Sequence, residues 1–263
     1  MKTRSMKPTK EEVARQFDRM STAYAHSEGH AGGDDLDILI RYVAPTEDML
    51  VLDVATGSGN TAAALAPFVK SVVAIDIAPA MLERTRELAA RKGLTNLTTA
   101  LMDVEALEYE DGWFDVVTSR IAPHHFIDIA KAIREIARVL RPGGAFVVED
   151  SVVPDDRDLD TFLNDVEKMR DPTHVRSLNA AEWTALLASA GLVQTKSTVC
   201  GKPHGFADWV ARAGMDDEGS EKVYAAFAAA SPAAIERFDI VYESGRAVRF
   251  TDEKIIIRAE KPS

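Results

Sequence analysis

The apolar residues of this chain fall in short runs, and segments with helical spacing separate the runs. A short apolar run bounded by turn residues is typical of a buried parallel strand. Such runs predict strands at residues 49–54, 97–101, 114–120, 145–149, 192–199 and 254–259, with a further strand that ends at residue 76. The alternation of strands and helices predicts an α/β fold.

Helices are predicted between and before these strands. Pro79 and Gly93 are typical of the first residue and the C-terminal cap of a helix. The apolar residues of 127–140 recur on one helical face. Residues 9–12 resemble a capping box at the start of an N-terminal helix, and residues 202–240 predict short helices inserted before the last strand.

The most informative segment follows the first strand, where Val-Leu-Asp-Val-Ala-Thr-Gly-Ser-Gly-Asn occupies residues 51–60. Gly57 and Gly59 allow a sharp turn, and a helix that begins near Asn60 points its free N–H groups at the same place. Asp76 ends the neighbouring strand, where its carboxylate can accept both hydroxyl groups of a ribose. An ordinary tight turn would explain the loop alone, but the loop and Asp76 together predict a cofactor that carries a nucleoside.

Two cofactors compete for this site, because residues 57–62 also match a relaxed dinucleotide pattern. Asp53 favours S-adenosylmethionine, since a carboxylate shortly before the first glycine can bind the amino-acid end of that cofactor. Asp103 favours it too, because an acid after the third strand can accept from the adenine amino group, with Val104 beside the ring. A nicotinamide oxidoreductase is the alternative enzyme class.

Five segments together resemble class I S-adenosylmethionine-dependent methyltransferases of the type 11-like, ubiquinone- and menaquinone-biosynthesis branch, whose uncharacterised relatives have unsettled substrates. These segments are residues 52–60, 74–82, 102–107, 114–120 and 138–144, and they cover about residues 45–150. Two residues depart from the usual pattern. Ala55 stands at the first loop glycine, as in the quinone branch, and Asn60 stands where an acid often follows.

The resemblance implies a Rossmann-like, doubly wound sheet of seven strands whose last strand is antiparallel. It also implies S-adenosylmethionine as cofactor and S-adenosylhomocysteine as product. We expect an N-terminal helical lid at residues 1–45, the cofactor-binding core at 46–200, and the helical insertion and final strand at 201–263. The residues expected to bind the cofactor are Asp53, Thr56, Gly57, Ser58, Gly59, Asp76, Ile77, Met81, Asp103, Val104 and Arg120.

The methyl acceptor is expected beyond the carboxyl ends of the strands, under the lid and the insertion. His124 and His125 follow the fourth strand there, so either is a candidate base for an acceptor that must lose a proton. Packing or helix capping would also explain these two histidines. Arg120 would help to hold the developing anion. The residues expected to bind the acceptor are Tyr24, His30, Arg120 and His174.

These acceptor-site residues also have simpler interpretations. Tyr24 would equally fix the lid to the core, and the charged stretch that contains His174 and Arg176 suits a solvated helix face. His26 and His30 have the spacing of metal ligands on a helix, but no third ligand is evident in the sequence. We therefore predict a structural or lid role for this pair, and no metal.

The net charge and the residues after the fourth strand narrow the class of methyl acceptor. The net charge of −11 without a basic stripe argues against a nucleic-acid substrate. The fourth strand is not followed by the Asn/Asp-Pro-Pro-Tyr motif of DNA and amide N-methylases. We therefore expect a small, partly apolar acceptor, with O- or C-methylation of a phenol or quinol as the leading hypothesis. A non-catalytic protein that binds the cofactor is the second hypothesis.

The location and assembly of the protein follow only in part. The single cysteine, Cys200, excludes an internal disulfide and fits a reducing cytoplasm. No apolar run reaches the roughly 18 residues of a membrane helix, so we expect no membrane span. The oligomeric state is left open, with a homodimer as one option.

Overall fold

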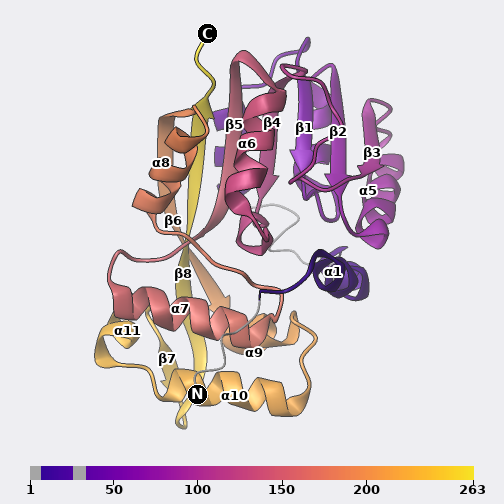
Figure 1. The fold of residues 1–263 in the computed structure, drawn as a ribbon. Helices are drawn as coiled ribbons and strands as arrows, with labels where there is room; N and C mark the ends of the chain where they lie inside the picture. Colours follow the sequence, from indigo (N-terminus) through magenta and orange to yellow (C-terminus); the bar gives the residue numbers. More distant parts are fainter. Residues whose placement is uncertain (1–6, 26–33) are drawn as a thin grey trace.

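The computed structural model describes residues 7–25 and 34–263, which form an upper lobe built on one β-sheet and a lower, mainly helical lobe (Figure 1). The strands are β1 (Leu50–Val54), β2 (Ser71–Asp76), β3 (Leu97–Leu101), β4 (Phe114–Arg120), β5 (Leu140–Val152), β6 (Val193–Gly205), β7 (Val241–Glu243) and β8 (Arg246–Glu260). The helices are α1 (Lys10–Ala25), α3 (Asp34–Val43), α4 (Asn60–Leu65), α5 (Pro79–Lys92), α6 (Ile129–Val139), α7 (Arg157–Arg170), α8 (Ala180–Ser189), α9 (Phe206–Ala211), α10 (Asp217–Ala228) and α11 (Pro232–Arg237).

The sheet has the strand order β3-β2-β1-β4-β5-β8-β6, and the short β7 pairs with β8. β1 is parallel to β2 and β4, whereas β8 is antiparallel to both β5 and β6. The predicted Rossmann-like order of seven strands with an antiparallel last strand is confirmed, and β7 is an addition to it. Strand order reverses between β1 and β4, which is where open α/β sheets bind ligands beyond their carboxyl ends.

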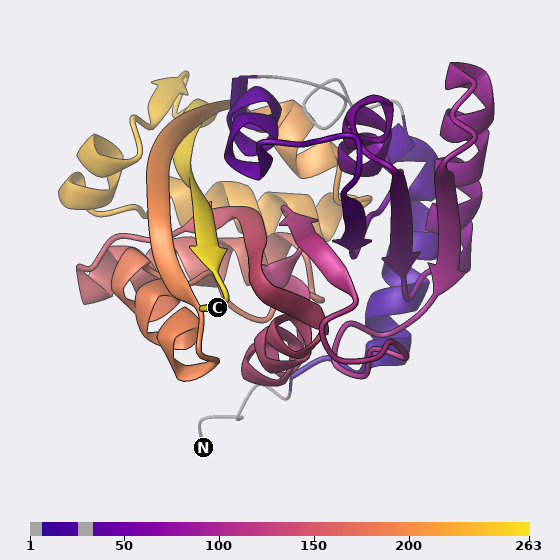
Figure 2. The same cartoon turned by 90° about the horizontal axis from the view of Figure 1, so that it is seen from above.

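Helices cover both faces of the sheet, and the alternation of side chains along each strand supplies both cores. Val116 and Ile256 pack on the face covered by α3, α4 and α5, whereas their neighbours Val117 and Ile257 pack on the face covered by α6 and α8. Seen from above, α6 and α8 lie on one side of the sheet and α3 on the other (Figure 2). The strand ends are therefore the part of the sheet left for a ligand.

A third cluster of buried residues fills the lower lobe. It joins Leu163 of α7 to Phe206 of α9 and Phe227 of α10, and Phe250 of β8 closes it. The rings pack edge to face, with centroids 4.6 Å apart for Phe206 and Phe227. The predicted short helices within 202–240 are confirmed, and α7 joins them in one core. The domain boundaries given above stay a prediction.

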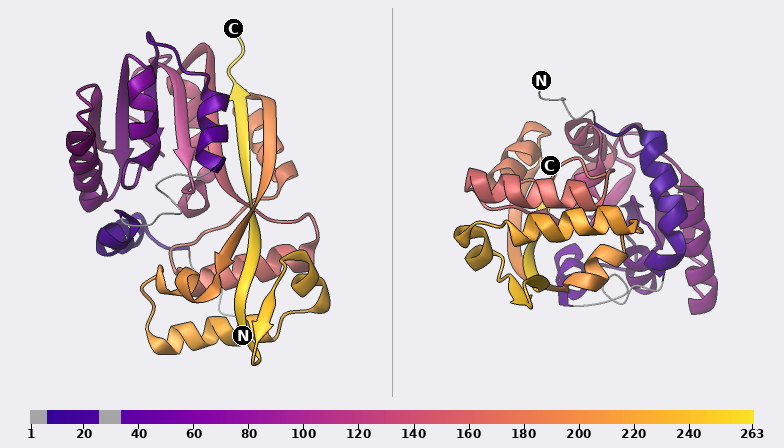
Figure 3. Two further views of the ribbon diagram at one scale, coloured as in Figure 1. Left: turned by 180° about the vertical axis from the view of Figure 1, so that it is seen from behind. Right: turned by 90° about the horizontal axis from the view of Figure 1, so that it is seen from below.

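Strands β5, β6 and β8 extend further than the sequence predicts. β6 continues to Gly205, and β8 begins at Arg246 rather than near residue 254. Pro203 would interrupt a central strand, but β6 lies at the edge of the sheet, where proline is tolerated. The paired ends of β6 and β8 run from the upper lobe into the lower one (Figure 3, left). This pairing fixes the lower lobe beneath the carboxyl ends of the parallel strands.

Helix ends agree with the sequence where capping residues mark them. Thr9 and Glu12 form the reciprocal hydrogen bonds of a capping box, and Gly93 ends α5 in the left-handed conformation. Among residues 7–25 and 34–263, no helix has both the length and the apolar character needed to cross a membrane. The cytoplasmic location stays a prediction.

Candidate active site

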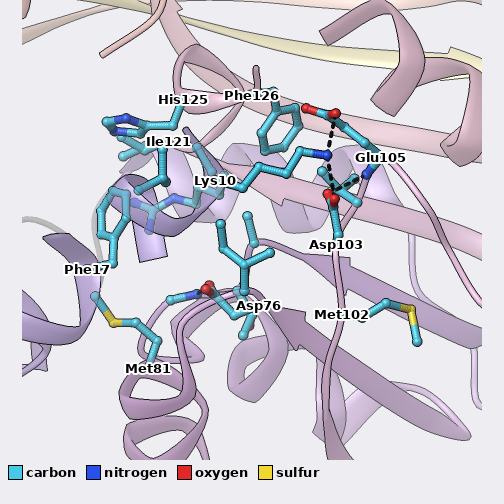
Figure 4. A pocket seen from close by; sticks show the side chains of 18 of the residues that line it. Lys10, Phe17, Asp76, Met81, Met102, Asp103, Glu105, Ile121, His125 and Phe126 are labelled. Carbon is cyan, nitrogen blue, oxygen red and sulfur yellow. Dashed lines mark hydrogen bonds and ion pairs between the residues drawn. The ribbon is translucent and has the colours of Figure 1, made fainter. Parts of the chain in front are cut away.

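A cavity with about 970 Å³ of empty space, part of it open to solvent, lies at the carboxyl ends of the parallel strands (Figure 4). The loop after β1 forms one wall, the ends of β2 and β3 form others, and α1 covers it. Nine of the predicted cofactor residues line this cavity: Thr56, Gly57, Ser58, Asp76, Ile77, Met81, Asp103, Val104 and Arg120. Asp53 and Gly59 do not.

Asp76 braces the loop that it faces. Its Oδ2 accepts a hydrogen bond from Gly57 N and its Oδ1 accepts one from Ala78 N, each at 2.9 Å. Burial raises the pKa of Asp76 to about 6, although the backbone donors oppose this shift. Because each carboxylate oxygen accepts more than one hydrogen bond, Asp76 can brace the loop and still bind ribose hydroxyls.

The two loop glycines are needed for different reasons. Gly57 has φ of +56°, and the direction in which a Cβ would project from it is open space. Gly59 has φ of +82°, and a Cβ there would lie 2.6 Å from Cγ2 of Thr85. Gly57 therefore leaves room that a ligand can occupy, whereas Gly59 lets α5 pack against the loop.

Asp53 lies beneath this loop. Its two carboxylate oxygens accept hydrogen bonds from the hydroxyls of Thr56 and Thr118, at 2.5 and 2.6 Å. Burial raises the pKa of Asp53 to about 6, against the lowering effect of both hydroxyls. The structure thus gives Asp53 the role of orienting Thr56, and a direct contact with the cofactor stays a prediction.

Lys10 of α1 closes the end of the cavity where adenine is expected. Its ammonium lies 2.5 Å from Asp103 Oδ2 and 2.6 Å from Glu105 Oε2 (Figure 4). Val13 and Phe17 line the same wall. The sequence analysis missed these three residues, yet their spacing of i, i+3 and i+7 places them on one face of α1.

Arg120 ends β4 and joins an ion-pair network at the cavity wall. Its guanidinium donates to Glu149 at 2.7 Å and to Asp35 at 3.2 Å, and Asp35 also accepts from Lys202 at 2.6 Å. Burial raises the pKa of Glu149 to about 7, while the charge of Arg120 opposes the shift. This network therefore ties β4, β5, α3 and β6 together, and a contact of Arg120 with cofactor or acceptor stays a prediction.

A second cavity, with an empty volume of about 940 Å³, adjoins the first, and Ile121 and His125 line both. Its other walls come from α7, the end of β6, α9 and β8, so it lies between the two lobes. The predicted residues His124 and His174 line it as well. The structure thus brings three of the predicted histidines together beside the cofactor cavity.

His124 forms a buried pair with Asp150 at the end of β5. His124 Nδ1 lies 2.5 Å from Asp150 Oδ1, and both side chains are at least nine-tenths buried. Burial alone would lower the pKa of His124, but the charge and hydrogen bond of Asp150 outweigh it, so this pKa lies above its ordinary value. The carboxylate accepts from Nδ1–H, which leaves Nε2 as the proton-accepting nitrogen.

His125 differs from His124 in its electrostatics. Its Nδ1 donates to the carbonyl oxygen of Thr173 at 3.1 Å, and its ring centroid lies 4.2 Å from that of His124. Burial, and then the neighbouring His124, lower the pKa of His125 to about 4. His125 is therefore a neutral imidazole at physiological pH, and its Nε2 lies 4.0 Å from Asp171 Oδ2.

The remaining predicted residues differ in whether they line a cavity. His174 Nε2 donates to Asn164 Oδ1 at 2.9 Å, and burial followed by the two other histidines holds its pKa well below the usual range. Arg176 pairs with Asp160 and Glu182 and lines neither cavity. The Tyr24 side chain, His26 and His30 lie outside the described residues.

The two cavities supply different parts of a group-transfer site, one for a nucleoside cofactor and one for an acceptor. One cavity offers an acid for a ribose, open space at Gly57 and apolar side chains, and the adjoining cavity is lined by His124, which pairs with the buried Asp150. In the part of the chain that the structure describes, no group of three His, Cys, Asp or Glu side chains is placed to hold a metal ion.

Comparison with known proteins identifies the class. Residues 52–148 match the family model described as "Methyltransferase domain". The chain is 31% identical over 246 residues to the uncharacterized methyltransferase YcgJ of Bacillus subtilis (strain 168), covering 93% of this chain and 97% of that protein. This protein therefore belongs to the S-adenosylmethionine-dependent methyltransferases, and S-adenosylmethionine is its cofactor.

Solved structures and further relatives agree with this assignment. BH2331 from Bacillus halodurans C-125 has a TM-score of 0.86 and 35% identity, covering 88% of this chain and 100% of that one. The ubiquinone/menaquinone biosynthesis C-methyltransferase UbiE of Zymomonas mobilis is 35% identical over 134 residues, which is 51% of this chain and 54% of UbiE. The predicted quinone-branch resemblance and enzyme class are confirmed, and the nicotinamide alternative is wrong.

Proposed function

We propose that this methyltransferase methylates a small, partly apolar molecule whose nucleophilic oxygen or carbon must lose a proton, with a phenol or quinol as the leading class. The observation that carries the proposal is the His124–Asp150 pair, in which Asp150 is buried and His124 lines a cavity beside the cofactor cavity. Methyl transfer requires a base only when the nucleophile keeps its proton at neutral pH. A buried histidine with a raised pKa at this position fits that need.

The bound cofactor supplies a methyl group on a positively charged sulfur, which is already a good electrophile. The protein then has to align the acceptor, exclude water and take up the acceptor's proton. In this proposal Asp150 orients His124, and His124 Nε2 accepts the proton. His125 lines both cavities and is the second candidate for that role.

The relatives support this acceptor class without naming the acceptor. UbiE is named as a C-methyltransferase of quinone biosynthesis, and the chain matches about half of UbiE. Phe17 packs edge to face against His125, with centroids 4.9 Å apart, so an apolar surface borders the boundary between the cavities. Such a surface suits an aromatic acceptor.

Two measurements test the proposal in sequence. Calorimetry with S-adenosylhomocysteine should give one site per chain, and a radiolabelled methyl-transfer assay should then compare phenols, quinols, thiols and amines. We expect transfer to phenols or quinols. A preference for thiols, amines, nucleic acid or protein side chains would reject the acceptor class, and cofactor binding without any transfer would favour a non-catalytic protein.

A further inference from the structure

The second cavity is more polar than the predicted acceptor class requires. Beyond the shared residues Ile121 and His125, most of its lining is charged or polar and comes from α7, α9, and the ends of β6 and β8. A phenol or quinol alone would leave these groups without a ligand partner. Their chemistry therefore indicates what the far end of the acceptor carries.

The lining holds more cations than anions, in a chain with the opposite balance. The whole chain has 31 Lys and Arg against 42 Asp and Glu. The cavity is lined by four of the former and three of the latter, namely Arg170, Lys202, Arg212 and Lys254 against Glu167, Asp208 and Asp252. Arg170 and Lys254 are ion-paired with Glu167 and Asp252 of the lining, Lys202 is paired with Asp35 outside it, and Asp208 is exposed. The cationic N–H donors of this wall are the groups that would bind an anionic ligand.

Lys254 is the most informative of these cations. It is 5% exposed at the start of the apolar run Ile255–Ile257, where an uncharged side chain would avoid the cost of burying an ammonium. Its Nζ donates to Ser151 Oγ and Asp252 Oδ2, both at 2.7 Å. An ammonium has three N–H donors, so a third is left for an oxygen within the cavity.

Two further groups of the same cavity are held in place before a ligand binds. The Arg170 guanidinium lies 4.7 Å from the centroid of the Trp209 ring and donates to Glu167. Arg212 Nη2 lies 3.5 Å from His204 Nδ1. A guanidinium fixed on an aromatic ring loses little freedom when it binds a planar anion.

We propose that the methyl acceptor carries a carboxylate, and that this carboxylate binds against Lys254, Arg170 and Arg212 while the nucleophile lies near His124 and His125, whose ring centroids are 4.2 Å apart. The acceptor class is thus a small, partly apolar hydroxy acid. This inference rests on the proposed function, because it assigns the second cavity to the acceptor. It adds the ionic group that distinguishes the acceptor from a neutral quinol.

The test compares acids with their amides on protein saturated with S-adenosylhomocysteine. The probes are 4-hydroxybenzoate and 3-(4-hydroxyphenyl)propionate, each paired with its primary amide, and binding is measured by ligand-observed NMR and calorimetry. We expect at least one acid to bind tenfold or more tightly than its amide. If neither acid binds more tightly than its amide, the carboxylate inference is wrong.

Variants assign the preference to the cavity. Lys254→Met should remove most of the acid preference, and Lys254→Met/Asp252→Asn should do the same without leaving Asp252 unpaired, should the single variant fold poorly. Lys222→Met is the matched control, because Lys222 pairs with Glu218 on exposed α10 and lines neither cavity. An acid preference that survives in the double variant would overturn the role of Lys254.

The outcomes separate the two proposals. Binding of S-adenosylhomocysteine with equal methylation of acids and amides would retain the proposed function and reject the carboxylate. Failure of S-adenosylhomocysteine to bind to the folded wild-type protein would instead reject the proposed function and, with it, the assignment of the second cavity.

Discussion

The two cavities of this protein are built in different ways. The cofactor cavity draws on four segments at the ends of parallel strands, at residues 55–61, 76–81, 102–105 and 120–127, with α1 as its cover. The second cavity draws its lining from the segment 121–125, His174, β5, α7, β6, α9 and β8, which are distant in sequence. The first has a glycine loop and carboxylates at strand ends, whereas the second is lined mainly by charged and polar side chains.

This difference has a physical cause. A strand end and the loop after it place their polar groups by local geometry, so a short motif carries the site with it. A site assembled from distant side chains depends on how two lobes pack, and no local pattern records that packing. Substitutions that perturb one cavity at a time can therefore test this difference.

The largest effect is expected in the second cavity, at the candidate base. His124→Gln should lower the single-turnover rate of methyl transfer by about 10²- to 10⁴-fold, as loss of a general base does. Affinity for S-adenosylhomocysteine, measured by calorimetry, should stay unchanged because His124 does not line the cofactor cavity. Wild-type turnover by folded His124→Gln and His125→Gln proteins would show that neither imidazole is the base.

The pH dependence of the same reaction tests the role of Asp150. His124 accepts a proton only when neutral, so kcat/KM should rise with pH and level off above a pKa that lies above 6.5. Asp150→Asn removes the charge that raises this pKa, so the rising part of the profile should move to lower pH. An unmoved profile would mean that another group titrates.

The next effect concerns the cofactor cavity. Asp76→Ala removes the predicted ribose contact and the acceptor for Gly57 N and Ala78 N. We expect cofactor affinity to fall about ten- to a hundredfold, roughly 1.5–3 kcal/mol. Asp111→Ala is the control, because Asp111 is 79% exposed and lines neither cavity. An unchanged dissociation constant in the folded Asp76→Ala protein would place the ribose elsewhere.

A substitution at Gly59 tests how the loop of the cofactor cavity packs against α5, with the free energy of unfolding as the measurement. Gly59→Ala should lower the free energy of unfolding by about 1–3 kcal/mol, because the new Cβ meets Thr85. Gly93→Ala is the matched control, since Gly93 also has positive φ but nothing within 4 Å of the added atom. Adding Thr85→Ala should recover part of the loss in urea denaturation. Equal costs at Gly59 and Gly93 would exclude a clash.

The smallest effect is expected at Lys10. Its ammonium pairs with Asp103, the predicted partner of the adenine amino group, and exposed ion pairs contribute about 0.2–1 kcal/mol. Lys10→Met should therefore free Asp103 and tighten S-adenosylhomocysteine binding by roughly two- to fivefold in calorimetry. Weaker binding would show instead that Lys10 holds α1 over the bound cofactor.

Residue patterns, together with the family resemblance that they carry, predict much of the fold and of the cofactor cavity. The sequence predicts the strands at 97–101 and 114–120, the helix from Pro79 and nine residues that line the cofactor cavity. Each of these features depends on an apolar run, a capping residue or a loop at a strand end. The sequence does not predict the long β6, since Pro203 normally ends a strand unless it lies at a sheet edge. Edge position is a property of the sheet and not of the segment.

The sequence by itself determined the class of the protein, because the cofactor site is built mainly from short segments at strand ends, and each of these segments folds locally. What only the tertiary structure decided is the acceptor side. Asp150 is 26 residues from His124, and Lys254 is more than 80 residues from the helix that carries Arg170. These side chains meet because β5, β8 and α7 pack at one junction between the lobes, and packing of that kind is chosen by buried surface rather than by any local sequence signal.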